Sequence, residues 1–132
     1  MGRDDQPQPD SPKILVAEDE PLIRMDIVET LAIDGFQVLE ASDGSEALRL
    51  IDDPDNFAMV VTDVNMPGVD GIDVAVRARE RHPEIPVLFV SARTDLLSLP
   101  RTPRPLSHLT KPFNMPDLAR KVRWLLLGRD GD

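Results

Sequence analysis

Four short apolar runs, each followed directly by a charged or hydroxyl-bearing residue, constrain the fold of this chain more than any other feature. Residues 14–17, 59–62 and 87–90 are rich in β-branched side chains, and residues 106–110 form a weaker run. Segments with apolar residues at helical spacing lie between most of these runs. This alternation is typical of parallel strands connected by helices, so we predict an α/β fold built on a parallel sheet.

The residues that follow these runs are the candidate functional residues. Glu18 and Asp19 follow the first run, Asp63 the second, Ser91 the third and Lys111 the fourth. In an open parallel sheet the carboxyl ends of the strands lie at one edge, and ligands bind outside that edge. We therefore expect these five side chains to meet in a single acidic pocket.

The length, composition and net charge of the chain limit the kinds of structure and of binding partner that are expected. The chain has 132 residues, no cysteine and a net charge of −9. The length suits one domain, and the lack of cysteine excludes disulfides and thiolate metal sites. No apolar stretch approaches the length of a membrane span. The net charge argues against a protein that binds nucleic-acid phosphates, which would need a basic face, and leaves room for a divalent cation or a basic protein surface as partner.

The acidic pocket has a chemistry that follows from its charges. Neighbouring carboxylates repel one another and raise their own pKa values unless a cation compensates. Mg2+ prefers oxygen ligands and typically takes one or two carboxylates together with phosphate oxygens. A carboxylate beside Mg2+ and the Lys111 ammonium is a nucleophile suited to an activated phosphoryl group. By its central position, Asp63 is the expected phosphoryl acceptor.

The polar ends of the chain flank a single predicted domain at residues 13–127. Residues 1–12 are rich in Asp, Gln and Pro, so we expect a disordered leader, and residues 128–132 are expected to be a disordered tail. Asn114 is a favourable N-cap for the last helix, and Trp124 lies off the apolar stripe of that helix.

One crossover breaks the alternation of strands and helices. A helix is expected between Ser91 and Lys111, but Pro100, Pro103 and Pro105 fall there. Since a proline inside a helix costs about 3 kcal/mol, we predict at most one turn near residues 94–99, followed by an extended segment. Arg101 and Arg104 make this segment locally basic. It is either an ordinary variable loop or a docking surface for a kinase or target.

Four motifs give the chain a family resemblance. They are KILVAEDE at residues 13–20, VVTDVNMPG at 60–68, VLFVSA at 87–92 and KPF at 111–113. In this order and spacing they resemble the receiver domain of bacterial two-component response regulators, of the single-domain, chemotaxis-regulator-like type. The resemblance implies a doubly wound, five-stranded parallel sheet in the flavodoxin-like order 2-1-3-4-5, here with a shortened or irregular fourth helix.

The resemblance also implies roles for the acidic residues. Asp63 matches the residue that accepts a phosphoryl group from the phosphohistidine of a partner kinase. Asp19 matches a direct Mg2+ ligand, and Glu18 acts mostly through water. The backbone carbonyl of Asn65 matches the third protein ligand. Glu18 stands where many members of the family have Asp.

Other residues match switching and rate-tuning positions of the family. Ser91 matches the hydroxyl residue that moves to the phosphoryl group, and Lys111 is its ion-pair partner. His108 aligns with the switch aromatic, where an imidazole packs like a small ring but also titrates near neutrality; the alternative is an exposed histidine on an edge strand. Asn65 and Arg93 match positions that tune the rates. The Lys111–Pro112 bond is often cis in this family.

The function implied is a cytoplasmic signalling switch, not an enzyme. Phosphorylation would alter the surface near the fourth helix, fifth strand and fifth helix, and so control an output partner; the phosphodonor is a sensor histidine kinase or phosphotransfer protein. Homodimerisation on phosphorylation, and excision from a longer protein, stay open. A pure scaffold has no reason to keep mutually repelling carboxylates. A metal-dependent phosphohydrolase usually has a second acid two residues after its nucleophile, where this chain has Asn65.

Overall fold

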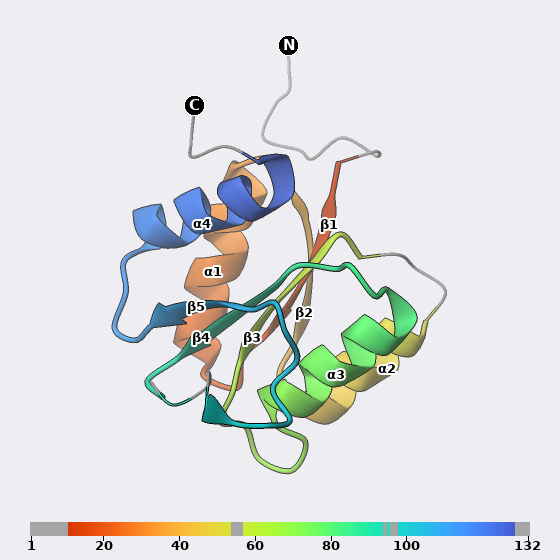
Figure 1. Cartoon of the computed structure of the whole chain (residues 1–132). Helices are drawn as coiled ribbons and strands as arrows, with labels where there is room; N and C mark the ends of the chain where they lie inside the picture. The colour runs from red at the N-terminus through yellow and green to blue at the C-terminus, as the bar shows by residue number, and fades with distance from the viewer. Residues whose placement is uncertain (1–10, 54–56, 94, 96–97, 129–132) are drawn as a thin grey trace.

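The computed structural model describes residues 11–53, 57–93, 95 and 98–128, which fold around one five-stranded parallel sheet (Figure 1). The strands are β1 (Lys13–Ala17), β2 (Gln37–Ala41), β3 (Met59–Asp63), β4 (Val87–Ser91) and β5 (Ser107–Thr110). Their spatial order is β2-β1-β3-β4-β5, and every neighbouring pair is parallel. The predicted fold class and strand order are confirmed.

Helices cover both faces of the sheet. They are α1 (Pro21–Ile33), α2 (Gly44–Asp52), α3 (Gly71–Arg81) and α4 (Met115–Leu127). Figure 1 shows α1 and α4 on one face and α2 and α3 on the other. Successive side chains of a strand point to opposite faces. In β1, Ile14 and Val16 therefore join the core under α1 and α4, whereas Leu15 and Ala17 join the core under α2 and α3.

The helix ends follow local sequence signals. The side chains of Asp43 and Asn114 accept backbone N–H groups at the starts of α2 and α4, and the N-cap predicted at Asn114 is confirmed. Asp70 and Asp73 form a capping box at the start of α3. α1 differs, because Glu20 precedes it without any side-chain cap hydrogen bond.

No α-helix occurs among the residues that the structure describes between β4 and β5, in agreement with the prolines there. The turn predicted near residues 94–99 lies partly outside the described residues. Residues 98–106, which we call the crossover segment, lie against α3 and are attached to it near both ends. Arg101 donates to Asp70 and Asp73 at the start of α3, the latter at 2.9 Å. Near the other end of α3, Arg79 donates to the carbonyl of Pro105 at 2.6 Å.

The predicted leader and tail lie almost wholly outside the described residues. Ser11 and Pro12 are described, and both accept hydrogen bonds from Gln37 of β2. Gly128 ends α4 in the left-handed conformation. None of the described helices is both long and apolar enough to span a membrane. Trp124 on α4 is 53% exposed, as its position off the apolar stripe predicts.

Candidate functional site

Three carboxylates and one ammonium group meet at the carboxyl ends of the strands. Glu18 and Asp19 follow β1, and Asp63 is the last residue of β3. One carboxylate oxygen of each lies within 4.8 Å of the others. The Nζ of Lys111, which follows β5, lies 2.8 Å from Oδ2 of Asp63 and 3.1 Å from Oε1 of Glu18. The parallel topology therefore brings together the four charged residues predicted from the strand ends.

Glu18 is fully buried, and its environment perturbs its ionisation. Burial raises the pKa of Glu18 to about 7, and the charge of Asp63 acts in the same direction. Hydrogen bonds from the Glu20 amide (3.1 Å) and from Lys111 oppose this rise. Burial by itself lowers the pKa of Lys111, but hydrogen bonds to Asp63 and Glu18 and their charges outweigh it and raise that pKa. Lys111 is thus a cation shared between two acids.

Asp63 is held by its neighbours along the chain. Its Oδ1 accepts the N–H of Asn65 at 3.2 Å, and its main-chain carbonyl accepts the hydroxyl of Thr62 at 2.8 Å. Gly71, the first residue of α3, packs directly against that carbonyl, and a Cβ there would overlap it. The start of α3 can therefore approach Asp63 only because residue 71 has no side chain.

Ser91 and Arg93 lie beside this cluster at the end of β4. Ser91 is buried, and its Oγ accepts the N–H of Arg93 at 3.1 Å. No hydrogen bond joins its hydroxyl to Asp63 or Lys111 in the described part of the chain. Its carbonyl accepts the N–H of Lys111 at 3.0 Å, which links the ends of β4 and β5. The Arg93 side chain pairs with Asp95 at 2.8 Å, and the Lys111–Pro112 bond is cis.

His108 lies on β5, in register with Phe89 of β4. The residue is half-buried, and its Nε2 is buried with no hydrogen-bond partner among the described residues. The imidazole is thus neither fully exposed nor fully buried on this edge strand, and its role at the switch position stays a prediction.

The donor set fits a hard divalent cation. Carboxylate oxygens are the ligands that Mg2+ takes from proteins, and the cluster of Glu18, Asp19 and Asp63 supplies three of them. The Asp19 side chain makes no hydrogen bond or ion pair within the described ranges, so its oxygens are available to a cation. The Asn65 carbonyl as a further ligand stays a prediction, and so do the rate-tuning roles of Asn65 and Arg93.

Two contacts of this site had little or no signal in the sequence. Nη1 of Arg24, on α1, donates to the carbonyl of Glu18 at 2.8 Å, and its Nε donates to Glu40 of β2 at 3.0 Å. Nothing in the pattern of α1 separates this arginine from an ordinary surface residue. The close approach of Gly71 had a weak signal, a glycine directly after the acidic N-cap Asp70.

Comparison with known proteins places the chain in a family. The family model described as "response regulator receiver domain" matches residues 14–123. The chain belongs to this receiver family. PdtaR, a transcriptional regulatory protein of Mycobacterium tuberculosis, is 42% identical over 114 residues, which cover 83% of this chain and 54% of PdtaR. CpdR, a response regulator receiver protein of Brucella abortus, is 33% identical over 118 residues, covering 87% of this chain and 97% of CpdR.

A solved structure extends the likeness to three dimensions. The response regulator TrrA of Thermotoga maritima, crystallised in complex with Mg2+ and BeF, matches with a TM-score of 0.78 at 31% identity. The match covers 87% of this chain and 99% of TrrA. This receiver spans about half the length of PdtaR but nearly all of CpdR.

Proposed function

We propose that this receiver accepts a phosphoryl group on Asp63, in a Mg2+-dependent transfer from the phosphohistidine of a partner kinase or phosphotransfer protein. The observation that carries the proposal is the Lys111 ammonium, 2.8 Å from Asp63, beside the carboxylates of Glu18 and Asp19. A carboxylate flanked in this way by positive charge can attack phosphorus. The proposal places the protein in the cytoplasm, as a switch within a two-component system or phosphorelay, and not as an enzyme.

The chain's own residues divide the work of this transfer. An oxygen of Asp63 forms the new bond to phosphorus while the phosphorus–nitrogen bond of the donor histidine breaks. Lys111 neutralises one equatorial oxygen of the transferring group, and the Ser91 hydroxyl donates to another after leaving its contact with the Arg93 amide. A bound Mg2+ would be held by Asp19 and Asp63, with Glu18 through water, and supplies the remaining charge neutralisation.

A cavity beside Lys111 offers an approach for the donor histidine. Its volume is about 480 Å3, and its lining is mostly apolar side chains from α1 and from the segment after β5. The lining residues are Ile23, Asp26, Ala92, Lys111, Pro112, Phe113 and Met115. Leu22 and Met25 of α1 are 72% and 60% exposed, so they add apolar surface on the same helix. We propose that a helix of the phosphodonor docks over this cavity and presents its histidine to Asp63.

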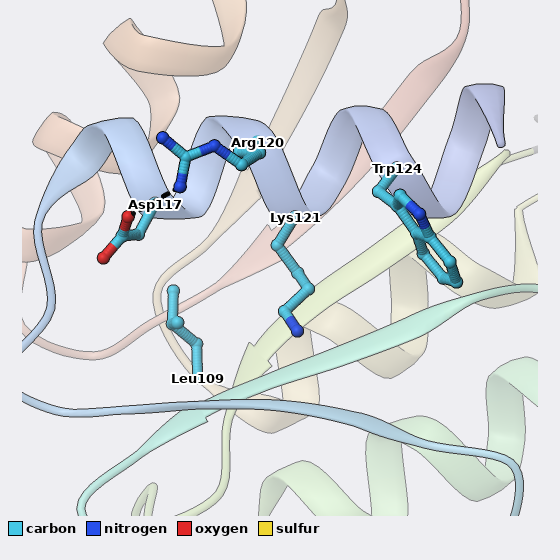
Figure 2. A pocket seen from close by; sticks show the side chains of 5 residues that line it. All are labelled: Leu109, Asp117, Arg120, Lys121 and Trp124. Atoms are coloured by element: carbon cyan, nitrogen blue, oxygen red, sulfur yellow. Dashed lines mark hydrogen bonds and ion pairs between the residues drawn. The ribbon is translucent and has the colours of Figure 1, made fainter. Parts of the chain in front are cut away.

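We place the responding surface at β5, α4 and the crossover segment. A hollow of about 370 Å3 lies between β5 and α4. Figure 2 shows that the side chains of Lys121 and Trp124 extend into it from the helix. Leu109 of β5 lies across from them, and Asp117 pairs with Arg120 at its rim. Lys111 directly follows β5, so a displacement of Lys111 toward a phosphoryl group would be transmitted to this hollow. An output partner, or a second copy of the chain, would respond to that change.

Intact mass tests the transfer. The protein is incubated with Mg2+ and acetyl phosphate, beside Asp63→Asn and a matched exposed control, Asp52→Asn. We expect one phosphoryl group on wild type and on the control, and none on Asp63→Asn. BeF with Mg2+, the combination bound to TrrA, should shift the amide resonances around Asp63 and Lys111. A wild type that neither gains mass nor responds to BeF would favour a scaffold instead.

A further inference from the structure

Arg24 makes contacts that connect the acidic cluster to the rest of the fold. It lies in the first turn of α1 with its side chain 17% exposed. Nη1 donates to the Glu18 carbonyl at 2.8 Å, and its own backbone N–H donates to the Glu20 carbonyl at 2.9 Å. A single residue thus holds the turn of residues 18–20 at two points. Its Nε anchors the guanidinium on Glu40 of β2, at 3.0 Å.

The turn that Arg24 holds has few other supports. The Glu18 amide bonds to the carbonyl of Ala41 in β2, but Glu18 lies beyond the last paired residue of β1, so its carbonyl has no partner in the sheet. Glu20 caps α1 without a side-chain hydrogen bond of its own, and its amide donates to the Glu18 carboxylate at 3.1 Å. A buried carbonyl without a partner is costly, and Arg24 supplies the partner.

Asp19 depends on this support more than the other two acids do. Glu18 and Asp63 are each held by Lys111, whereas the Asp19 carboxylate has no partner in the part of the chain that the structure describes. Its direction is therefore set by its backbone. The Glu18 carbonyl that Arg24 binds belongs to the peptide unit joining Glu18 to Asp19, which is planar. A bond that orients this carbonyl also orients the amide of Asp19.

We propose that Arg24 is a positioning residue for the divalent-cation site, holding the peptide between Glu18 and Asp19 so that Asp19 faces the cation. The inference rests on the proposed binding of Mg2+ at this cluster. Groups that hydrogen-bond around metal ligands typically change metal affinity about 10- to 100-fold when removed.

Whether the loss of Arg24 weakens or strengthens Mg2+ binding separates a positioning role from a simple electrostatic effect. Arg24 carries a positive charge near a site for a cation, so removing the charge should by itself strengthen Mg2+ binding. A positioning role predicts the opposite, because a misdirected Asp19 is a poorer ligand. A purely structural role would lower the unfolding midpoint without changing the Mg2+ affinity of the folded protein.

The experiment is a titration with Mg2+ alone at pH 8, followed by the amide resonances of residues 18–20. Arg24→Ala should raise the dissociation constant about tenfold. Arg24→Lys keeps the charge but cannot reproduce the forked contacts, so it should raise the constant by a smaller factor. Glu40→Gln keeps the bond between Arg24 and the Glu18 carbonyl, so it should change the dissociation constant for Mg2+ less than about threefold. Arg49→Ala, which removes an exposed arginine paired with Glu46, is the matched control and should bind as wild type does.

A second readout is the dependence of acetyl phosphate labelling on Mg2+ concentration. In Arg24→Ala the half-saturating concentration should rise about tenfold, while the rate at saturation stays within about threefold of wild type. An Arg24→Ala protein that is folded and binds Mg2+ as tightly as wild type, or more tightly, would overturn the inference. If Arg24→Ala does not fold, unchanged affinity in Arg24→Lys would overturn it. A wild type that binds no Mg2+ would instead overturn the proposed metal site itself.

Discussion

The buried carboxyl of Glu18 should make the stability of this receiver fall as pH rises when Mg2+ is absent. The pKa of Glu18 is raised to about 7 from its ordinary value of 4.5, chiefly by burial. Below pH 4.5 this group is protonated in the folded and the unfolded chain, so it imposes no penalty. Between pH 4.5 and 7 the unfolded chain loses the proton while the folded protein keeps it, and stability falls. The loss is complete above about pH 7.

The magnitude follows from the two pKa values. At about 1.4 kcal/mol per pH unit, the interval corresponds to about 3 kcal/mol of unfolding free energy. Glu18→Gln removes the titration but keeps the size of the side chain. An amide offers one acceptor where the carboxylate offers two, so the variant also loses a hydrogen bond, to Lys111 or to the Glu20 amide. Because glutamine does not titrate, this loss is the same at pH 5 and pH 8, so the comparison across pH removes it.

Urea unfolding in EDTA at pH 5 and pH 8 measures the effect. Relative to Glu18→Gln, wild type should lose about 3 kcal/mol between the two pH values. Adding Mg2+ at pH 8 should stabilise wild type more than the variant, because the cation binds the folded protein only and an ionised Glu18 adds a negative charge to its site. If the difference between the two proteins is the same at pH 5 and pH 8, the carboxyl is not perturbed and the reasoning is wrong.

Three further substitutions, one of them with a comparison variant, test other contacts. Lys111→Ala should still accept some phosphoryl group but show no structural response, and a wild-type response in amide resonances would remove the switching role assigned to this lysine. Gly71→Ala places a Cβ against the carbonyl of Asp63 and should lower the unfolding free energy by about 2 kcal/mol or more. Gly68→Ala is its comparison, because φ at Gly68 is +75° but nothing lies within 4 Å of an added Cβ, and a smaller loss is expected; equal losses would argue against the close approach. His108→Phe removes a buried nitrogen without a partner and should raise stability by about 1 kcal/mol in urea unfolding, whereas a clear loss would mean that Nε2 is hydrogen-bonded in solution.

The central strands could be predicted because burial on both faces produces continuous apolar runs. β3 and β4 are buried at every residue, and both stand out in the sequence. β5 is an edge strand with no fully buried residue, so its apolar run is weaker, and the run at residues 106–110 begins one residue before the strand does. The strand-end site followed from the topology, since parallel strands place their carboxyl ends together.

What could not be predicted depends on long side chains that reach across the fold. Arg101 contacts Asp70 and Asp73, 31 and 28 residues away in sequence, and Arg24 contacts Glu40, 16 residues away. Such contacts leave no periodic signal, because an exposed arginine has the same pattern whether or not it finds a distant partner. The sequence therefore predicts which groups form the site but not which groups orient them.

The crossover segment has a consequence for how this receiver can change over time. In a helix, adding one residue rotates every later side chain by about 100° around the axis and so disrupts the buried face. Residues 98–106 form no α-helix, so they have no such register to keep. They are attached to α3 by the hydrogen bonds of Arg79 and Arg101. Lengthening a loop costs little free energy. Insertions and deletions between these two anchors should therefore be tolerated, and this edge of the domain can diversify while the phosphoryl site stays constant.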